Sequence, residues 1–412
     1  MRTVVWLVLL SVVAVVAATL LGGNDGLVTV YWNGWRTDVS LNLAVVMLVA
    51  FCAVVMLAWQ AVHVLITLPR RAGEWRALRK ERVAHASLRE ALAEYFAARY
   101  SRAHKAALRA LAIHRETAEL QREREFGSLS QLLAAASLHR LQDRERRDQL
   151  LVELLASPRS ATRADEGARL LAAEWALDDR DADTALNRLG ELPPGVARRT
   201  QALRLRLRAS RQARQPLEAL RTARTLAHHG AFSPEAARGL VRSLAFEVLD
   251  GAHDLQQLRR AWEQFDAAER RDGFIVARAA QRAAALVSPE TGRDWLRPAW
   301  DRLVDLDRDQ REQVALALVA VVDGLGNDWL PRLEQAAAAF PAEPAIGAAV
   351  GHAFAERQLW GKARPLLEQA AQAVELPSRL RRGAWRQLAR LAQEEGDDTR
   401  ARQCEQAAAA VD

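Results

Sequence analysis

The stretch VGHAFAERQLWGKARPLLEQA, residues 350–370, carries the sharpest pattern in this chain. Small and large apolar residues recur in two successive segments of it at helical spacing. Gly351 and Ala363 are expected where two paired helices touch, because small side chains let helix backbones approach closely. Phe354 and Leu367 are expected to fill the adjoining core, with Ala370 one turn further on. The stretch therefore predicts a pair of helices packed against each other.

The glycine, aromatic and alanine spacings of this pair match the tetratricopeptide (TPR) pattern. A weaker second copy follows with Trp385, Leu388 and Ala401. Earlier units share the small-residue spacing, as at Ala103, Ala107 and Ala110, but lack most of the consensus. Breaks recur at roughly 30 to 45 residues between equivalent points, which is typical of a solenoid of helix pairs. We expect these breaks at residues 178–183, 192–195, 228–230, 250–251, 288–289, 323–324, 340–341 and 394–398.

Two uncharged stretches, residues 3–21 and 40–68, precede the repeats. A helix rises about 1.5 Å per residue, so each can cross the roughly 30 Å hydrocarbon core of a bilayer. Alanine and arginine, both strong helix formers, dominate after Pro69. The predicted fold is all-α: two N-terminal transmembrane helices, then a TPR-like α-solenoid of divergent repeats. The expected parts are a transmembrane hairpin (1–68), divergent repeats (69–315) and C-terminal TPR-like repeats (316–412).

A basic collar follows the second apolar stretch and sets the expected orientation. Lysine and arginine near membrane ends favour the cytoplasmic side, so both termini and the repeats are expected there, in a multi-pass protein. Between the stretches, Asn33-Gly34 suits a type I′ turn and predicts a small external β-hairpin. In an alternative reading, residues 1–18 are a cleaved signal peptide. The collar consists of Arg70, Arg71, Arg76, Arg79, Lys80 and Arg82.

The formal charge of +7 raises nucleic acid as a partner. Much of the excess lies in the collar, however, and beyond it arginines alternate with acidic residues, as in 140–148. We therefore predict no nucleic-acid partner and expect the collar to bind anionic lipid headgroups. Cys52 lies at membrane depth and Cys404 near the C-terminus, so no disulfide framework is implied.

The sequence offers little catalytic or metal-binding chemistry. Its acidic runs depart from the calcium-loop pattern, and no Cys-x-x-Cys-His motif occurs. We predict no catalytic residues and no metal site. His63, in the second apolar stretch, is a weak candidate ligand for haem or porphyrin, although a structural position near the membrane interface is the simpler interpretation.

Several features together resemble the proteobacterial HemY family. They are the two N-terminal stretches, the loop Asn33-Gly34-Trp35, the Leu-Pro-Arg-Arg exit, the segment Tyr100-Ser101-Arg102-Ala103, Trp262, and Leu359-Trp360-Gly361-Lys362-Ala363-Arg364.

The resemblance implies an inner-membrane TPR protein associated with late protohaem biosynthesis. It is not expected to be the flavin-dependent protoporphyrinogen oxidase of the same name, because the sequence has no glycine-rich dinucleotide fingerprint. We expect a scaffold whose concave TPR face binds a protein partner, such as a terminal haem-synthesis enzyme, or porphyrin. The alternatives are a TPR adaptor for envelope assembly or protein export, and a tetrapyrrole-modifying enzyme.

Overall fold

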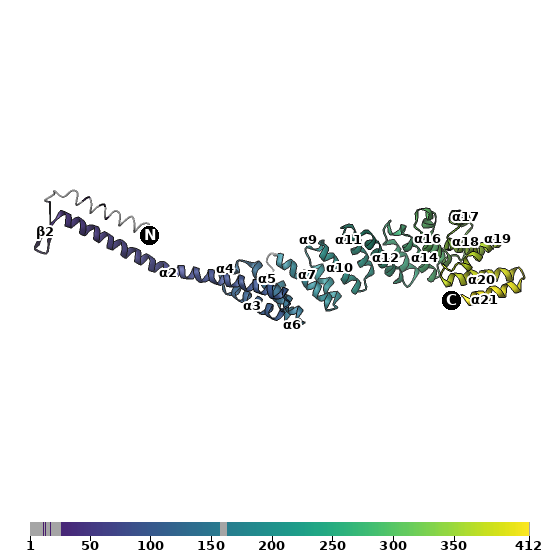
Figure 1. Cartoon of the computed structure of the whole chain (residues 1–412), viewed down its shortest axis with the longest axis horizontal. Coiled ribbons are helices and arrows are strands. Elements are labelled where there is room, and N and C mark those ends of the chain that lie inside the picture. Colours follow the sequence, from purple (N-terminus) through teal and green to yellow (C-terminus); the bar gives the residue numbers. More distant parts are fainter. Residues whose placement is uncertain (1–10, 12, 14–16, 18–25, 157–162, 412) are drawn as a thin grey trace. The chain divides into compact units, whose positions relative to one another are not determined.

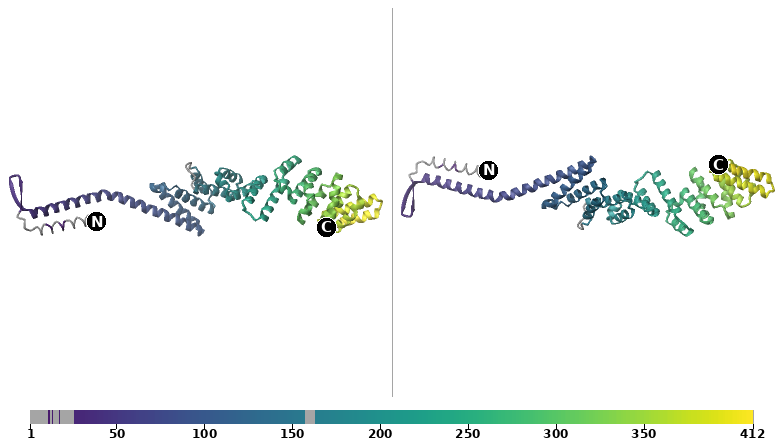
Figure 2. Two further views of the ribbon diagram at one scale, coloured as in Figure 1. Left: turned by 90° about the horizontal axis from the view of Figure 1, so that it is seen from above. Right: turned by 90° about the horizontal axis from the view of Figure 1, so that it is seen from below.

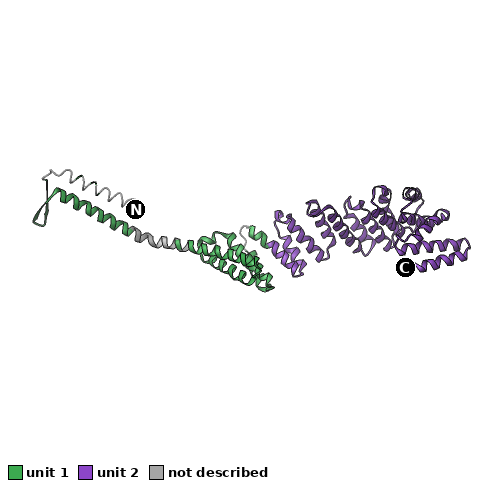
Figure 3. Ribbon diagram, in the orientation of Figure 1, with its two compact units in different colours: residues 1–168 green, residues 169–412 purple. Residues whose placement is uncertain are grey.

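The structure, a computed structural model, describes residues 11, 13, 17, 26–156 and 163–411; side chains are described for these except residues 63–74, 76 and 77. Helices make up nearly all of the described secondary structure, which confirms the all-α class. The chain divides into two compact units, Met1–Ala168 and Arg169–Asp412 (Figure 3). The domain boundaries expected at 68 and 315 stay predictions.

A β-hairpin opens the described part of the first unit. Strand β1 (Leu27–Trp32) pairs antiparallel with β2 (Trp35–Ser40), and Trp32 lies opposite Trp35. Asn33 and Gly34 join the strands with φ angles of 49° and 84°, as a type I′ turn requires. The predicted hairpin is confirmed.

Helix α2 (Leu41–Phe96) is a single helix of 56 residues (Figure 1). Its first part, Leu41–Val62, is 22 residues long with a mean hydropathy of 2.7, and none of the window tested is buried. It is long and apolar enough to cross a membrane. This is the one such segment in the described part of the chain, and the stretch predicted at 3–21 lies outside the described residues, apart from isolated positions.

The helices expected at 40–68 and after Pro69 are therefore one helix. Proline removes one backbone donor, but strong helix formers on both sides carry α2 through it. Helix α3 (Tyr100–Glu116) then packs along the second half of α2. Ala103 and Ala107 of α3 and Ala91 of α2 are fully buried, so the two backbones lie close together. The unit continues with α4 (Ala118–Gln121), α5 (Arg124–Arg140) and α6 (Arg144–Leu155).

The second unit is a succession of paired helices (Figure 2). Neighbouring helices pack together in pairs, as α10 does with α11 and α18 with α19, and the alternate helices α12, α14, α16, α18 and α20 also lie side by side. The bounds are α7 (Arg163–Asp178), α8 (Ala182–Gly190), α9 (Pro194–Ala197), α10 (Thr200–Gln212), α11 (Pro216–His228), α12 (Pro234–Asp250), α13 (Leu255–Glu263), α14 (Gly273–Ala285), α15 (Pro289–Trp300), α16 (Arg308–Ala320), α17 (Leu330–Ala339), α18 (Pro344–Glu356), α19 (Trp360–Gln372), α20 (Ser378–Glu394) and α21 (Asp398–Ala410), with 3₁₀ turns at Glu269–Arg271, Leu303–Asp305 and Asn327–Trp329.

Each predicted break includes residues that lie between helices, although the stretches 178–183 and 192–195 also include the first two residues of α8 and of α9. Helix ends commonly use a residue with positive φ, whose successor donates a backbone hydrogen bond to the carbonyl five residues earlier. Gly230 and Gly396 fill this position after α11 and α20. Arg214 fills it between α10 and α11 with φ of 54°, and this break was not predicted.

Arginine side chains tie successive helix pairs of the second unit together. Arg278 donates to Asp250, 28 residues earlier, at 2.8 and 2.6 Å. Arg242 donates to Asp272, 30 residues later, at 2.7 Å, and Arg311 to Glu343, 32 residues later, at 2.9 and 2.5 Å. These separations equal about one helix pair. The contacts therefore repeat with the period of the architecture itself.

Candidate functional site: an arginine-lined groove

The sequence Leu-Arg-Leu-Arg-Leu-Arg, residues 203–208, alternates as a β-strand would, yet it forms part of α10. The helix lies between two apolar clusters. Leu203 and Leu207 belong to the cluster shared with α11 and α12, whereas Leu205 belongs to the cluster shared with α7 and α8. Because both flanks are buried, the arginines between them, Arg204 and Arg208, point to solvent.

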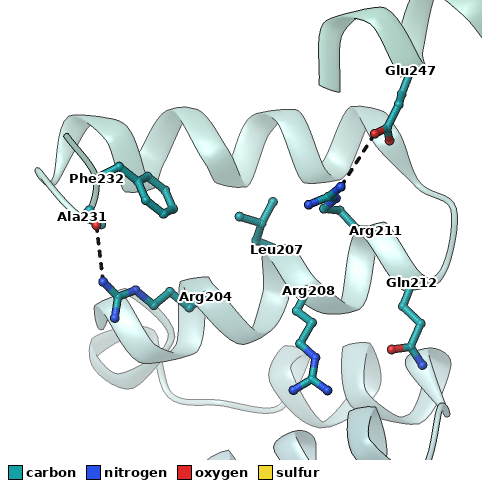
Figure 4. A pocket seen from close by; sticks show the side chains of 8 residues that line it. All are labelled: Arg204, Leu207, Arg208, Arg211, Gln212, Ala231, Phe232 and Glu247. Carbon is teal, nitrogen blue, oxygen red and sulfur yellow. Dashed lines mark hydrogen bonds and ion pairs between the residues drawn. The ribbon is translucent and has the colours of Figure 1, made fainter. Parts of the chain in front are cut away.

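An open groove of about 680 Å³ follows this exposed face (Figure 4). Leu207 and Phe232 form its apolar surface. In the view Leu207 lies between Arg204 and Arg211, and the Phe232 ring lies beside Arg204. Phe232 is half-buried in the turn before α12, and Leu207 is 9% exposed. The lining residues are Arg204, Leu207, Arg208, Arg211, Gln212, Ala231, Phe232 and Glu247.

The arginines of the groove are held loosely. Arg208 pairs with Asp178 of α7 at 3.0 Å, and Arg211 with Glu247 of α12 at 4.0 Å. Arg204 donates to the Ala231 carbonyl at 3.4 Å. Exposed ion pairs stabilise a fold by only about 0–1 kcal/mol, so these contacts exchange readily for a ligand's groups. The three arginines are thus matched by only two carboxylates, those of Asp178 and Glu247.

The residues expected in TPR packing lie in the C-terminal helix pairs. A Cβ added to Gly351 would come within 3.2 Å of Leu366 and Leu367, so α18 and α19 touch there. The structure brings Gly351, Phe354, Ala363, Leu367 and Ala370 together in one helix pair. Phe354, Ala363, Leu367, Ala370 and Ala401 are buried, and Trp385 packs partly buried against the same core.

The basic collar lies on α2, beyond its apolar segment. Arg79, Lys80 and Arg82 are exposed; the Arg79 guanidinium lies 5.7 Å from the centre of the Trp75 ring, and Lys80 Nζ lies 3.5 Å from Glu116. The side chains of Arg70, Arg71, Arg76 and His63 lie outside the described residues. His63 itself is the residue that follows the apolar segment Leu41–Val62 on α2.

Among the described residues, one cluster could hold a metal ion. Ligand atoms of Glu81, His85 and Glu123 lie within 4.8 Å of one another. His85 Nε2 lies 3.8 Å from Glu123, and its ring meets the ring of Phe126 edge-on at 4.8 Å. These contacts already account for the cluster as a tie between α2 and the turn before α5.

His352 is the most perturbed titratable group outside the membrane segment. Burial in α18 lowers its pKa from 6.5 to about 4, because the charged imidazolium would lose its hydration. Its Nε2 has no hydrogen-bond partner, and its ring lies against Gly383 of α20. His352 is therefore a neutral core residue, remote in sequence from the groove.

Comparison with known families bears on the first unit. Residues 26–142, which span the β-hairpin, α2, α3 and α5, match the family model described as the HemY protein N-terminus. The first unit therefore contains a region that matches the HemY N-terminal domain. A comparison with curated protein sequences gave no significant match.

The HemY match confirms the family resemblance seen in the sequence and supports an association with haem biosynthesis and with a membrane. The groove lies beyond residue 142, outside the matched HemY region. Its residues were not predicted as a site. Arg204, Arg208 and Arg211 recur at helical spacing, which is a readable signal, but the chain has 58 lysines and arginines, and only packing reveals which of them line a groove.

Proposed function

We propose that this protein is a membrane-anchored TPR scaffold that supports a late step of protohaem (porphyrin) biosynthesis. It holds a pathway enzyme, or porphyrin, near the inner membrane through its helical-repeat unit. The observation that carries the proposal is the open groove of the second unit, in a chain that also has a membrane-length helix and a HemY domain. Tethering a partner at a surface raises its effective concentration without new catalytic chemistry.

The proposed topology places both termini and the helical repeats in the cytoplasm, with residues 3–21 as a first span and residues 40–68, which include Leu41–Val62, as the second. The collar Arg70–Arg82 supports it, since basic residues beside a span favour the cytoplasmic side. Exposed Arg79, Lys80 and Arg82 are suited to anionic lipid headgroups.

The TPR assignment is supported by the tight crossing at Gly351 and by side-chain ties that recur at 28 to 32 residues. Repeats of this kind offer a continuous surface made by successive first helices, which suits binding of another protein.

The test is site-directed photo-crosslinking in cells, with the crosslinker at Gln212 and, as a matched control, at Gln403 of α21. Crosslinks from Gln212 to enzymes that make or modify porphyrin, and an accumulated porphyrin intermediate in a deletion strain, are expected. Crosslinks only to export or cell-wall proteins, with normal porphyrin levels, would instead favour the envelope adaptor.

A further inference from the structure

We propose that the groove binds an acidic, amphipathic segment of the partner protein: an apolar side chain rests on Leu207 and Phe232, and carboxylates on either side of it pair with Arg204 and Arg211. This inference rests on the proposed scaffold function and names the chemistry of its partner.

The spacing of the arginines sets the ligand's charge pattern. Arg204, Arg208 and Arg211 stand at i, i+4 and i+7 on α10, and at about 1.5 Å per residue the outer two are roughly 10 Å apart along the axis. Carboxylates two helical turns apart in a ligand helix have the same separation. A planar guanidinium binds a carboxylate through two parallel hydrogen bonds, so the match is directional.

The apolar surface sets the ligand's central side chain. In Figure 4 Leu207 lies between Arg204 and Arg211, and the Phe232 ring lies next to Leu207 on the Arg204 side. A leucine or aromatic side chain of the ligand that packs on these two residues is removed from water. Its burial stabilises the complex by about 25 cal/mol per Å² of apolar surface buried. Acidic side chains on both sides of one apolar anchor are therefore the pattern that fits.

One face of α12 carries small exposed residues beside the groove residue Glu247. Ser243, Gly239 and Ala236 share the helical face of Glu247 and are all exposed. A Cβ added to Gly239 would meet nothing within 4 Å. These small side chains would not obstruct a ligand that extends from Glu247 along α12.

A polypeptide fits these features better than a nucleic acid does. The basic row is short, because three arginines offer few of the phosphate contacts that hold a nucleic acid. Glu247 and Asp178 pair with two of these arginines at exposed positions, so a ligand's carboxylates replace them at little cost.

The experiment measures fluorescence anisotropy of a labelled helical peptide with the full chain in detergent micelles. The probe has one leucine flanked by glutamates, and the glutamates are spaced one and two helical turns apart. In one control peptide lysines replace the glutamates, and in a second control peptide alanine replaces the leucine. We expect saturable binding that weakens with salt, and at least tenfold weaker binding for Arg204→Glu or Arg211→Glu. Phe232→Ala should weaken binding several-fold. The matched control is Arg402→Glu, the same charge change on exposed α21, which should leave binding unchanged.

Three outcomes would each overturn the inference. The lysine peptide could bind as tightly as the probe, or Arg402→Glu could weaken binding as much as the groove variants do. Single-stranded DNA or anionic vesicles could also bind more tightly than the probe, through Arg204 and Arg211. Circular dichroism of every variant separates lost binding from lost folding. If the peptide fails to bind while Gln212 still crosslinks to porphyrin enzymes, the acidic ligand is wrong and the scaffold function stands. If the peptide binds but Gln212 gives no crosslinks to porphyrin enzymes, the proposed scaffold function is wrong, and the proposed ligand chemistry of the groove stands.

Discussion

At the scale of single residues, the chain places small and neutral groups where helices meet. Gly351 was predicted to lie at such a contact from the spacing of its neighbours, and its hydrogen atom does point at Leu366 and Leu367. His352, beside it, could not be recognised as buried from the sequence, because histidine is as common on surfaces as in cores. Its environment depends on Gly383, 31 residues away, which leaves space for the ring.

His352 should make the C-terminal helix pairs sensitive to mild acid. Its pKa is about 4 in the folded chain against 6.5 normally, so below pH 6.5 the unfolded chain binds a proton that the folded chain excludes. Stability is therefore fully present above pH 6.5 and falls as the pH drops toward 4, by roughly 3 kcal/mol at most. Thermal unfolding of the full chain at several pH values should show this loss, and His352→Leu should flatten it. An unchanged slope in the variant would refute this assignment.

Gly351→Val should destabilise the contact between α18 and α19. The new side chain would overlap Leu366 and Leu367, and overpacking of a core typically costs about 1–3 kcal/mol. Gly347→Val is the matched control, since Gly347 lies in the same helix and a Cβ there meets nothing within 4 Å. Its midpoint should stay above that of Gly351→Val. Thermal denaturation measures the two midpoints, and equal midpoints would contradict the predicted overlap.

At the scale of elements, the sequence predicted helix ends well where glycine, proline or aspartate marks them. The turns at Gly230, at Ser288-Pro289 and at Gly396 fall where expected. The end of α10 was missed because Arg214, which adopts positive φ there, is not a residue type that signals a turn. The groove was missed for a related reason: its walls come from α10 and from a turn before α12, and their approach depends on packing between repeats.

The tie between Arg311 and Glu343 should couple α16 to α18. Both side chains are less than 20% exposed, at 16% and 18%, so breaking the pair leaves a poorly hydrated charge. We expect each single alanine variant to lose about 1–3 kcal/mol, and the double variant to lose less than the sum. The exposed pair of Arg308 and Glu375 is the control, and its coupling should stay below about 1 kcal/mol. A double-mutant cycle measured by thermal unfolding gives both values, and additivity at Arg311 and Glu343 would contradict the coupling.

At the scale of the whole molecule, composition and hydropathy predicted an all-α chain with two membrane-length segments. The structure confirms the helical class and has a membrane-length helix at the second segment, whereas the first lies outside the described residues apart from isolated positions. They also predicted that a new helix begins after Pro69, whereas α2 runs through this proline without interruption, because local helix propensity outweighs one lost hydrogen bond. The division into units at residue 168 left no mark in the composition. It follows from contacts, which hydropathy does not report.

The proposed topology predicts where a reporter joined to the C-terminus is active. A fluorescent protein that folds only in the cytoplasm should be bright there, and alkaline phosphatase, active only in the periplasm, should be inactive. Val54→Arg adds about 2.5–3.5 kcal/mol to the free energy of inserting Leu41–Val62 into the membrane. If residues 3–21 then span alone, the C-terminus lies in the periplasm and phosphatase activity should rise. Leu108→Arg, on a partly exposed position of α3, is the control. High phosphatase activity in the unaltered chain would reverse the proposed orientation.

The recurring ties between helix pairs bear on how such a chain can change in length. Each arginine finds its acceptor about one pair away, as Arg242 finds Asp272 and Arg311 finds Glu343. A duplicated pair would carry its own donor and its own acceptor, so it could join the array without leaving an unmatched charge at either junction. Genes that gain or lose one such segment in frame should therefore still encode a folded protein. Its surface for binding a partner would be longer or shorter by one helix pair.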